Sequence, residues 1–173
     1  AYCEYVDSPD YIDGAALVEE YDNVVMTRTF SKIHGLAALR LGWAYCSAEV
    51  ADVLNRVRGP FNVSLAAQAA GVAAIKDKAH IERSKELNSR LLNWFRQQMA
   101  ALNLQTHDSV GNFVLVNFDA GIKADAAIEF LKAKGILVRG MAAYGLPSHL
   151  RISIGTEEEM RAVVDNLTVF AHE

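Results

Sequence analysis

Hydrophobic and polar residues follow one another along the first half of the chain in patterns that predict short strands and longer helices. The β-branched run at residues 23–30 predicts a buried strand, and residues 39–46 form a second strand candidate. Ser47 is placed to cap a helix over residues 47–58, and Ser64 to cap an Ala-rich helix that follows the break at Pro60. We therefore expect strands followed by helices in this half.

The second half has a long periodic helix and then a more even alternation of elements. Apolar residues recur along one side of residues 80–102, which predicts an amphipathic helix. Beyond it we expect strands at 111–118, 136–140 and 149–155, a helix over 123–135 that ends at Gly135, and a helix over 156–173 capped by Thr156. These elements predict a compact α+β lobe, and Trp43 and Trp94 are expected in the protein core.

Composition and charge narrow the class of protein. Of the 173 residues, 51% are hydrophobic and 22% are charged, which is typical of a folded globular protein. Lys and Arg number 17 against 21 Asp and Glu, and this balance does not favour nucleic acid as a partner. No stretch is apolar enough to span a membrane. Cys3 and Cys46 fit neither a disulfide scaffold nor a metal site, so we expect free thiols in the cytoplasm and no metal.

The opening of the chain is unusual. The segment AYCEYVDSPDY has no initiator Met, no helix cap and no apolar run leading into it. It resembles the end of a strand that has been cut open. We therefore expect these 173 residues to be the later part of a larger protein.

The candidate chemistry lies in TRTFSKIHGLAALRLGW, residues 27–43. Lys32 follows a predicted strand and is flanked by Thr29 and Ser31, and Arg40 comes eight residues later. An amine can condense with an aldehyde, hydroxyls can bind a phosphate, and a guanidinium can add a charge-assisted pair. The residue types alone leave open that Lys32 is an ordinary solvated surface lysine.

This segment resembles the lysine signature of the fold-type I, or aspartate aminotransferase, family of enzymes that use pyridoxal 5'-phosphate (PLP). The resemblance implies that Lys32 binds the cofactor covalently and moves a proton during catalysis. It also implies that Thr29, Ser31 and Arg40 bind the cofactor phosphate.

The first residues resemble a second motif of that family, Asp-Glu-Ala-Tyr. The match in AYCEY implies that the Tyr2 hydroxyl binds the phenolic oxygen of the cofactor. The family's Asp, which pairs with the pyridine nitrogen, would lie before Ala1. For this reason we expect residues 1–173 alone to be inactive.

The C-terminal segment GILVRGMAAYGLPSHLRISIGTEEEM is similar to that of histidinol-phosphate aminotransferases. This resemblance implies that Arg151 binds the anionic end of the substrate and that Arg139 is a second anion contact. The segment GPFNVS also resembles that subfamily, where it reaches toward the other subunit, which implies a homodimer.

Together these features predict an α/β protein with the fold-type I architecture. We expect the end of the PLP-binding large domain at about 1–65, connector helices at about 66–103, and a small α+β domain at about 104–173. The implied reaction converts L-histidinol phosphate and 2-oxoglutarate into imidazole acetol phosphate and glutamate, a step of histidine biosynthesis.

Several alternatives stay open at this point. An aromatic or broad-specificity aminotransferase, or a threonine-phosphate decarboxylase, would share Lys32, Arg40 and Arg151. A protein of another class, a folded fragment without catalysis, is also compatible with the sequence. Residue types favour packing roles for His34 and Tyr144, and they leave Arg28 open between a surface residue and a site residue.

Overall fold

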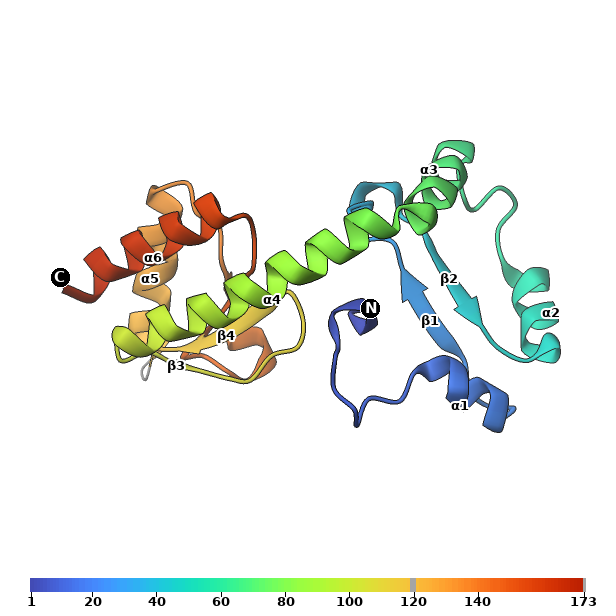
Figure 1. Ribbon diagram of the computed structural model, residues 1–173, viewed down its shortest axis with the longest axis horizontal. Helices are drawn as coiled ribbons and strands as arrows, with labels where there is room; N and C mark the ends of the chain where they lie inside the picture. The colour runs from blue at the N-terminus through green and yellow to red at the C-terminus, as the bar shows by residue number, and fades with distance from the viewer. Residues whose placement is uncertain (119–120, 173) are drawn as a thin grey trace. The chain divides into compact units, whose positions relative to one another are not determined.

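A computed structural model describes residues 1–118 and 121–172. The chain forms two compact units, Ala1–Lys85 and Glu86–Glu173, and each is described separately (Figure 1). The helix α4, Lys78–Ala101, contains the boundary between them. The three-part division expected from the sequence stays a prediction.

The first unit contains a small antiparallel sheet with helices around it. Its elements are η1 (Cys3–Tyr5), α1 (Gly14–Glu20), β1 (Met26–Thr29), η2 (Ala37–Leu39), β2 (Gly42–Tyr45), α2 (Ala48–Val57) and α3 (Leu65–Lys76). Strand β1 pairs with β2 so that Met26 lies opposite Tyr45 and Thr29 opposite Gly42. Both predicted helix caps are confirmed, because the side chains of Ser47 and Ser64 accept hydrogen bonds from backbone N–H groups of α2 and α3.

Apolar burial in the first unit is limited. Its buried apolar side chains are Met26, Phe30, Ile33 and Ala67. Helix α3 approaches this group through Gly71, where an added Cβ would collide with the Leu41 side chain and would lie 3.7 Å from Phe30. An added Cβ at residue 71 would therefore require the Leu41 side chain to shift.

Two expectations for this unit are wrong. The opening residues form the 3₁₀ helix η1 instead of the end of a strand. Trp43 is 44% exposed, because it lies on β2, a strand with no buried residue, whereas Trp94 is partly buried against the core of the second unit.

The second unit is built on a four-stranded antiparallel sheet with the order β3-β4-β6-β5. Its elements after α4 are β3 (Gln105–Thr106), β4 (Phe113–Asn117), α5 (Gly121–Ala133), β5 (Arg139–Gly140), η3 (Ala142–Tyr144), β6 (His149–Ser153) and α6 (Glu157–His172). The strand expected at 136–140 is thus shorter than predicted. Two predicted helix signals are confirmed: Gly135, at φ 77°, follows the end of α5, and Thr156 caps α6 through the Glu159 N–H.

The two faces of this sheet have different roles. Residues that alternate along β4 and β6 pack with the helices into one buried cluster, which includes Phe95, Met99, Val114, Val116, Leu131, Leu150, Ile152 and Leu167. The cross-strand partners Leu115, Arg151 and Arg139 fall on the opposite face, because neighbouring residues in a strand point to opposite sides. The second unit therefore buries one sheet face and displays basic side chains on the other.

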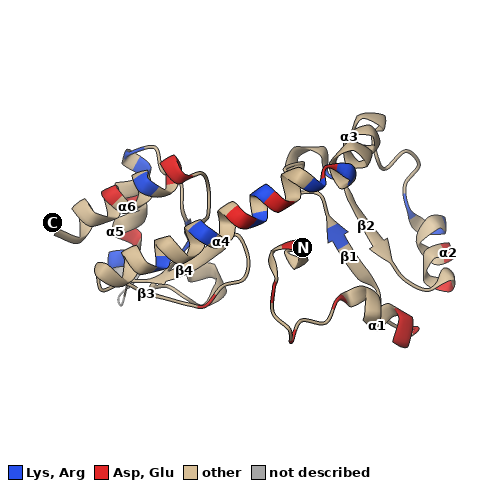
Figure 2. Cartoon of the chain, viewed as in Figure 1, with Lys and Arg blue, Asp and Glu red and all other residues tan. Residues whose placement is uncertain are grey.

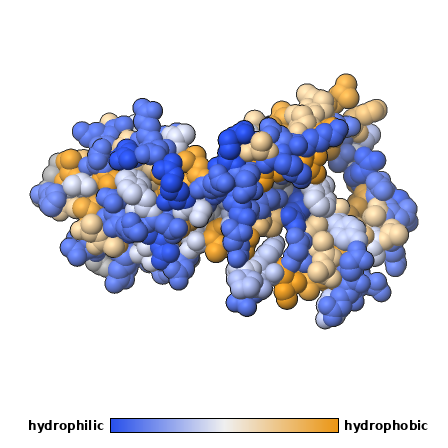
Figure 3. Space-filling view, viewed as in Figure 1, coloured by the Kyte–Doolittle hydropathy of each residue, from blue (hydrophilic) through white to orange (hydrophobic). Residues whose placement is uncertain are grey.

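The surface shows mixed charge and local apolar areas. Basic and acidic residues alternate along α4 (Figure 2). Apolar atoms gather over α3, whose Leu65, Val72 and Ile75 side chains are exposed (Figure 3). Within residues 1–118 and 121–172, no helix combines the length and apolarity that a membrane span requires.

Candidate functional site

The loop after β1 holds Lys32 between two buried side chains, Phe30 and Ile33. The Phe30 N–H donates to the Leu41 carbonyl at 3.1 Å, and the Leu36 N–H donates to the Phe30 carbonyl at 2.9 Å. These bonds close the loop on itself at both ends. The sequence therefore fixes the backbone position of Lys32 through local turns and apolar anchors on either side.

Tyr2 and Lys32 lie side by side although they are far apart in the sequence. The Lys32 ammonium nitrogen is 5.5 Å from the centre of the Tyr2 ring, which is within range of a cation–π contact. Tyr2 immediately precedes η1, and Lys32 follows β1. The structure thus brings together an amine and a phenol that were singled out separately in the sequence.

The hydroxyl and guanidinium groups expected to bind a phosphate also meet. Arg40 donates from Nη1 to the Ser31 hydroxyl at 3.3 Å and to the Ala37 carbonyl at 2.6 Å. The Ser31 N–H donates to the Thr29 hydroxyl at 3.0 Å. Arg40 itself has a left-handed backbone, with φ 51°, which turns the chain from η2 into β2. Thr29, Ser31 and Arg40 therefore form one small polar cluster next to Lys32 in the chain.

His34 packs beside this cluster. Its ring lies 4.9 Å from that of Phe30, in agreement with the packing role expected from the sequence. Its Nδ1 atom is buried and has no hydrogen-bond partner among the residues that the structure describes.

Arg139 and Arg151 belong to the second unit, where they lie directly opposite each other on β5 and β6. The Arg151 guanidinium lies over the Phe113 ring, 4.2 Å from its centre. Arg139 donates to the Tyr144 hydroxyl at 2.9 Å and lies over that ring. Like charges opposite each other on a sheet are destabilising, so this pair is suited to an anion that would neutralise it.

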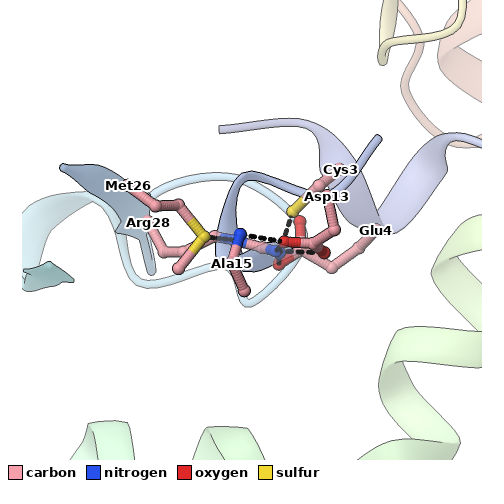
Figure 4. Close-up of polar contacts among 6 residues, drawn as sticks. All are labelled: Cys3, Glu4, Asp13, Ala15, Met26 and Arg28. Atoms are coloured by element: carbon pink, nitrogen blue, oxygen red, sulfur yellow. Dashed lines mark hydrogen bonds and ion pairs between the residues drawn. The ribbon is translucent and has the colours of Figure 1, made fainter. Parts of the chain in front are cut away.

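A polar network around Arg28 was not identified from the sequence (Figure 4). Arg28 donates to both carboxylate oxygens of Asp13, at 2.8 and 2.6 Å, contacts the Cys3 thiol, and lies 3.5 Å from the Glu4 carboxylate. The hydrogen bond from Arg28 lowers the pKa of Asp13, and the backbone bond from Ala15 lowers it further. Burial, followed by the neighbouring Glu4, raises the pKa of the Cys3 thiol to about 11, so the thiol is protonated at neutral pH.

Comparison with known proteins places this geometry in a family. Residues 1–167 match the family model described as aminotransferase class I and II. The chain belongs to the class I and II aminotransferases. The family uses PLP, and the chain has the fold-type I architecture expected from the sequence.

Two curated relatives within this family are described as histidinol-phosphate aminotransferases. The chain is 60% identical to the histidinol-phosphate aminotransferase of Rhodospirillum centenum over 168 residues, which is 96% of this chain and 46% of that protein. It is 51% identical to the enzyme of the same name from Maricaulis maris, over 98% of this chain and 48% of that one. The chain therefore spans about half the length of the curated relatives it matches.

A solved structure of a similar enzyme also matches nearly the whole of this chain over about half of its own length. The structure of histidinol-phosphate aminotransferase from Sinorhizobium meliloti in complex with PLP superposes with a TM-score of 0.90 at 27% identity. The superposition covers 99% of this chain and 47% of that one.

The residues present here are chemically suited to PLP. A phosphate ester needs cationic and neutral hydrogen-bond donors, and the cluster supplies the Arg40 guanidinium and the hydroxyls of Ser31 and Thr29. An aldehyde needs an amine, which Lys32 supplies, with the Tyr2 ring beside it. A guanidinium carries five N–H donors, and the two Arg40 contacts use only Nη1. The donor set therefore fits the cofactor of the family.

Proposed function

We propose that the protein containing this chain is a PLP-dependent aminotransferase, and specifically a histidinol-phosphate aminotransferase. It would convert L-histidinol phosphate and 2-oxoglutarate into imidazole acetol phosphate and L-glutamate. The observation that carries the proposal is the Lys32 amine beside the Tyr2 ring, in a chain 60% identical to an enzyme of that name. We further propose that residues 1–173 alone do not catalyse the reaction, since they span about half of such an enzyme.

Each proposed site residue of the first unit would have a role in binding the cofactor or in catalysis. When bound, PLP supplies an electron sink for the negative charge that develops at the substrate Cα. Lys32 would bind it covalently through Nζ and move the proton at Cα. Thr29, Ser31 and Arg40 would hold the phosphate, and the Tyr2 hydroxyl would donate a hydrogen bond to the phenolic oxygen.

Arg151 and Arg139 would bind the anionic group of the substrates. Their pairing across β5 and β6 supports this role, as do the aromatic rings that orient both guanidinium groups. Arginine presents a planar fork of donors that a lysine ammonium cannot reproduce. Arg151→Lys should therefore raise KM for both substrates by about tenfold, a loss of about 1.4 kcal/mol, while cofactor absorbance is unchanged. Unchanged KM values would assign Arg151 a structural role only.

Steady-state kinetics of the protein at its natural full length would test the proposed activity. We expect kcat/KM to be much higher with L-histidinol phosphate than with phenylalanine. A preference for phenylalanine would favour an aromatic aminotransferase, and release of carbon dioxide from threonine phosphate would favour a decarboxylase. Absence of turnover with every substrate would favour a protein without catalytic activity.

We also propose that the protein acts as a homodimer in the cytoplasm. Phe61 supports a dimer, since its side chain is 96% exposed in the segment that resembles the subunit-reaching segment of the relatives. The free thiols of Cys3 and Cys46 are compatible with a reducing compartment. Sedimentation equilibrium would measure the mass of the particle, and a monomer at micromolar concentration would contradict the proposed dimer.

A further inference from the structure

Arg28 connects three segments of the first unit through one guanidinium group (Figure 4). It lies on β1, and it reaches Asp13, the N-cap of α1, as well as Cys3 and Glu4 on η1. Its Nε atom also lies 3.3 Å from the Met26 sulfur. The Arg28 side chain is 16% exposed and that of Glu4 23%, whereas the Asp13 side chain is 47% exposed, so the network is shielded from water mainly on its arginine side.

The segments that Arg28 connects are those that carry Tyr2 and Lys32. Tyr2 is the residue before η1, and its carbonyl accepts a hydrogen bond from the Tyr5 N–H at 3.0 Å. Lys32 is in the loop directly after β1. A shift of η1 against β1 would therefore change the position of the Tyr2 ring over the Lys32 amine.

Little else in the backbone holds the opening segment against the sheet. For residues 3–13, backbone hydrogen bonds in the described chain are local, such as Val6 N–H to Cys3 carbonyl and Tyr11 N–H to Ser8 carbonyl. Lys85 adds an ion pair to Asp7, whose side chain is exposed. Arg28 thus supplies polar contacts from β1 to both Cys3 and Glu4 of η1.

We propose that Arg28 is a positioning residue that holds η1 against β1 and thereby keeps the Tyr2 phenol beside the Lys32 amine. This inference rests on the proposed function, in which Tyr2 donates to the phenolic oxygen of the cofactor. A hydrogen bond to an oxyanion favours the charged form of that oxygen. Displacement of Tyr2 should therefore raise the pH midpoint at which the absorbance of the bound cofactor changes.

The test is a pH titration of cofactor absorbance in the protein at its natural full length, loaded with PLP. Arg28→Ala should raise the midpoint by about one pH unit, and Tyr2→Phe should raise it by a similar amount. The double variant should show no further rise, because Arg28 acts through Tyr2. Arg28→Lys should give a smaller rise, since an ammonium cannot bind both Asp13 oxygens and Glu4 in the same way.

Matched variants separate positioning from general loss of stability. Asp13→Asn keeps a good N-cap for α1 but removes the carboxylate, so it should raise the midpoint less than Arg28→Ala and show the same non-additivity with Tyr2→Phe. It replaces Arg28→Ala if that variant does not fold. Arg56→Ala, which breaks an exposed pair with Asp52, should change nothing. Unchanged midpoints in the Arg28 and Asp13 variants, or additive shifts, would overturn the proposal.

A second measurement does not depend on the cofactor. Amide hydrogen exchange at Tyr5 and Val6, whose N–H groups close η1, should be at least tenfold faster in Arg28→Ala without PLP. Unchanged exchange would overturn the positioning role whether or not PLP binds. Failure of the unaltered protein to bind PLP would instead overturn the proposed function, so the two failures are distinguishable.

Discussion

The two units differ in what holds them together. In the second unit, side chains from one sheet face and the helices form a single cluster in which Phe95, Leu131 and Leu167 are fully buried. In the first unit only a few apolar residues are buried, and large ones such as Val57, Phe61 and Leu65 are exposed. The first unit relies on short loops, a glycine contact and the polar ties of Arg28.

The two units, which differ in packing, also carry different candidate binding groups. The groups suited to a phosphorylated aldehyde lie mainly at the end of β1 and in the loop that follows it in the sparsely packed first unit, whereas the second unit presents two arginines from the strands of a sheet. Loops placed by a scaffold are common carriers of binding residues. The comparison therefore predicts that substitutions in the two units will affect different measurements.

The largest expected effect is complete loss of covalent cofactor binding in Lys32→Ala. Borohydride reduction of the PLP-loaded protein should fix the cofactor on Lys32, because this amine lies in the signature loop beside Tyr2. Peptide mapping by mass spectrometry would locate the adduct. Lys76→Ala, at an exposed position of α3, is a control that should retain the adduct on Lys32. A reduced adduct on a lysine of the second unit would contradict the assignment of covalent cofactor binding to the first unit.

A substitution in the core of the second unit should lower stability and leave the residues that we propose bind the cofactor in place. Phe95 is 0% exposed, so Phe95→Ala should lower the free energy of unfolding of this unit by about 3–5 kcal/mol. Amide hydrogen exchange in β4 and β6 would report the loss, and the exposed Gln97→Ala would serve as control. Equal acceleration of exchange in β1 and β2 would show that the two units unfold as one.

Removal of the Arg40 guanidinium, which we propose binds the cofactor phosphate, should have an intermediate effect, on the affinity for PLP. Arg40→Ala should weaken PLP binding by about 10- to 100-fold, as expected for loss of a charge-assisted hydrogen bond. Equilibrium dialysis would measure the affinity, with Arg56→Ala as a control that leaves it unchanged. Wild-type affinity in Arg40→Ala would remove Arg40 from the proposed phosphate site.

The smallest expected effect concerns a histidine pair in the second unit. His149 is buried with its Nε2 atom 2.9 Å from that of His107, and burial, followed by the charge on His107, lowers the pKa of His149. Between about pH 6.5 and the lower folded pKa, the unfolded chain therefore binds more protons than the folded chain, and stability present above this range is lost as the pH falls through the folded pKa.

His149→Gln should consequently reduce the acid sensitivity of the second unit. Urea unfolding at pH 8 and pH 5 would measure it, and the drop between these conditions should be smaller in the variant than in the wild type. The same drop in both proteins would show that His149 does not contribute to the pH dependence.

Features that depend on neighbouring residues were predictable from the sequence. Ser47, Ser64 and Thr156 cap their helices because the cap and its N–H partner are only three residues apart. The cluster of Thr29, Ser31 and Arg40 also forms within one short segment, since its two side-chain bonds join residues two and nine positions apart. The roles of these residues toward a cofactor and substrate stay predictions.

Features that depend on distant contacts were not predictable. The bond from Arg28 to Asp13 joins residues 15 positions apart, and no periodicity indicates it. The short strand β5 was overestimated because Ile136 and Val138 pack against the core cluster before the ladder begins at Arg139. Trp43 was misplaced since a large aromatic residue on a two-stranded sheet has little in the first unit to cover it.

The left-handed backbone at Arg40 places two requirements in opposition: a stable turn favours glycine at this position, whereas the proposed phosphate contact needs the arginine side chain. At φ 51° the backbone favours glycine, because a side chain in this conformation meets its own carbonyl. An arginine at this position is therefore a compromise, in which its guanidinium is retained at the expense of local stability. A glycine at this position would relax the turn by about 1 kcal/mol and remove the proposed phosphate contact, whereas alanine would only remove that proposed contact. If Arg40 binds the cofactor phosphate as proposed, the turn before β2 is a place where a more stable protein would bind the cofactor more weakly.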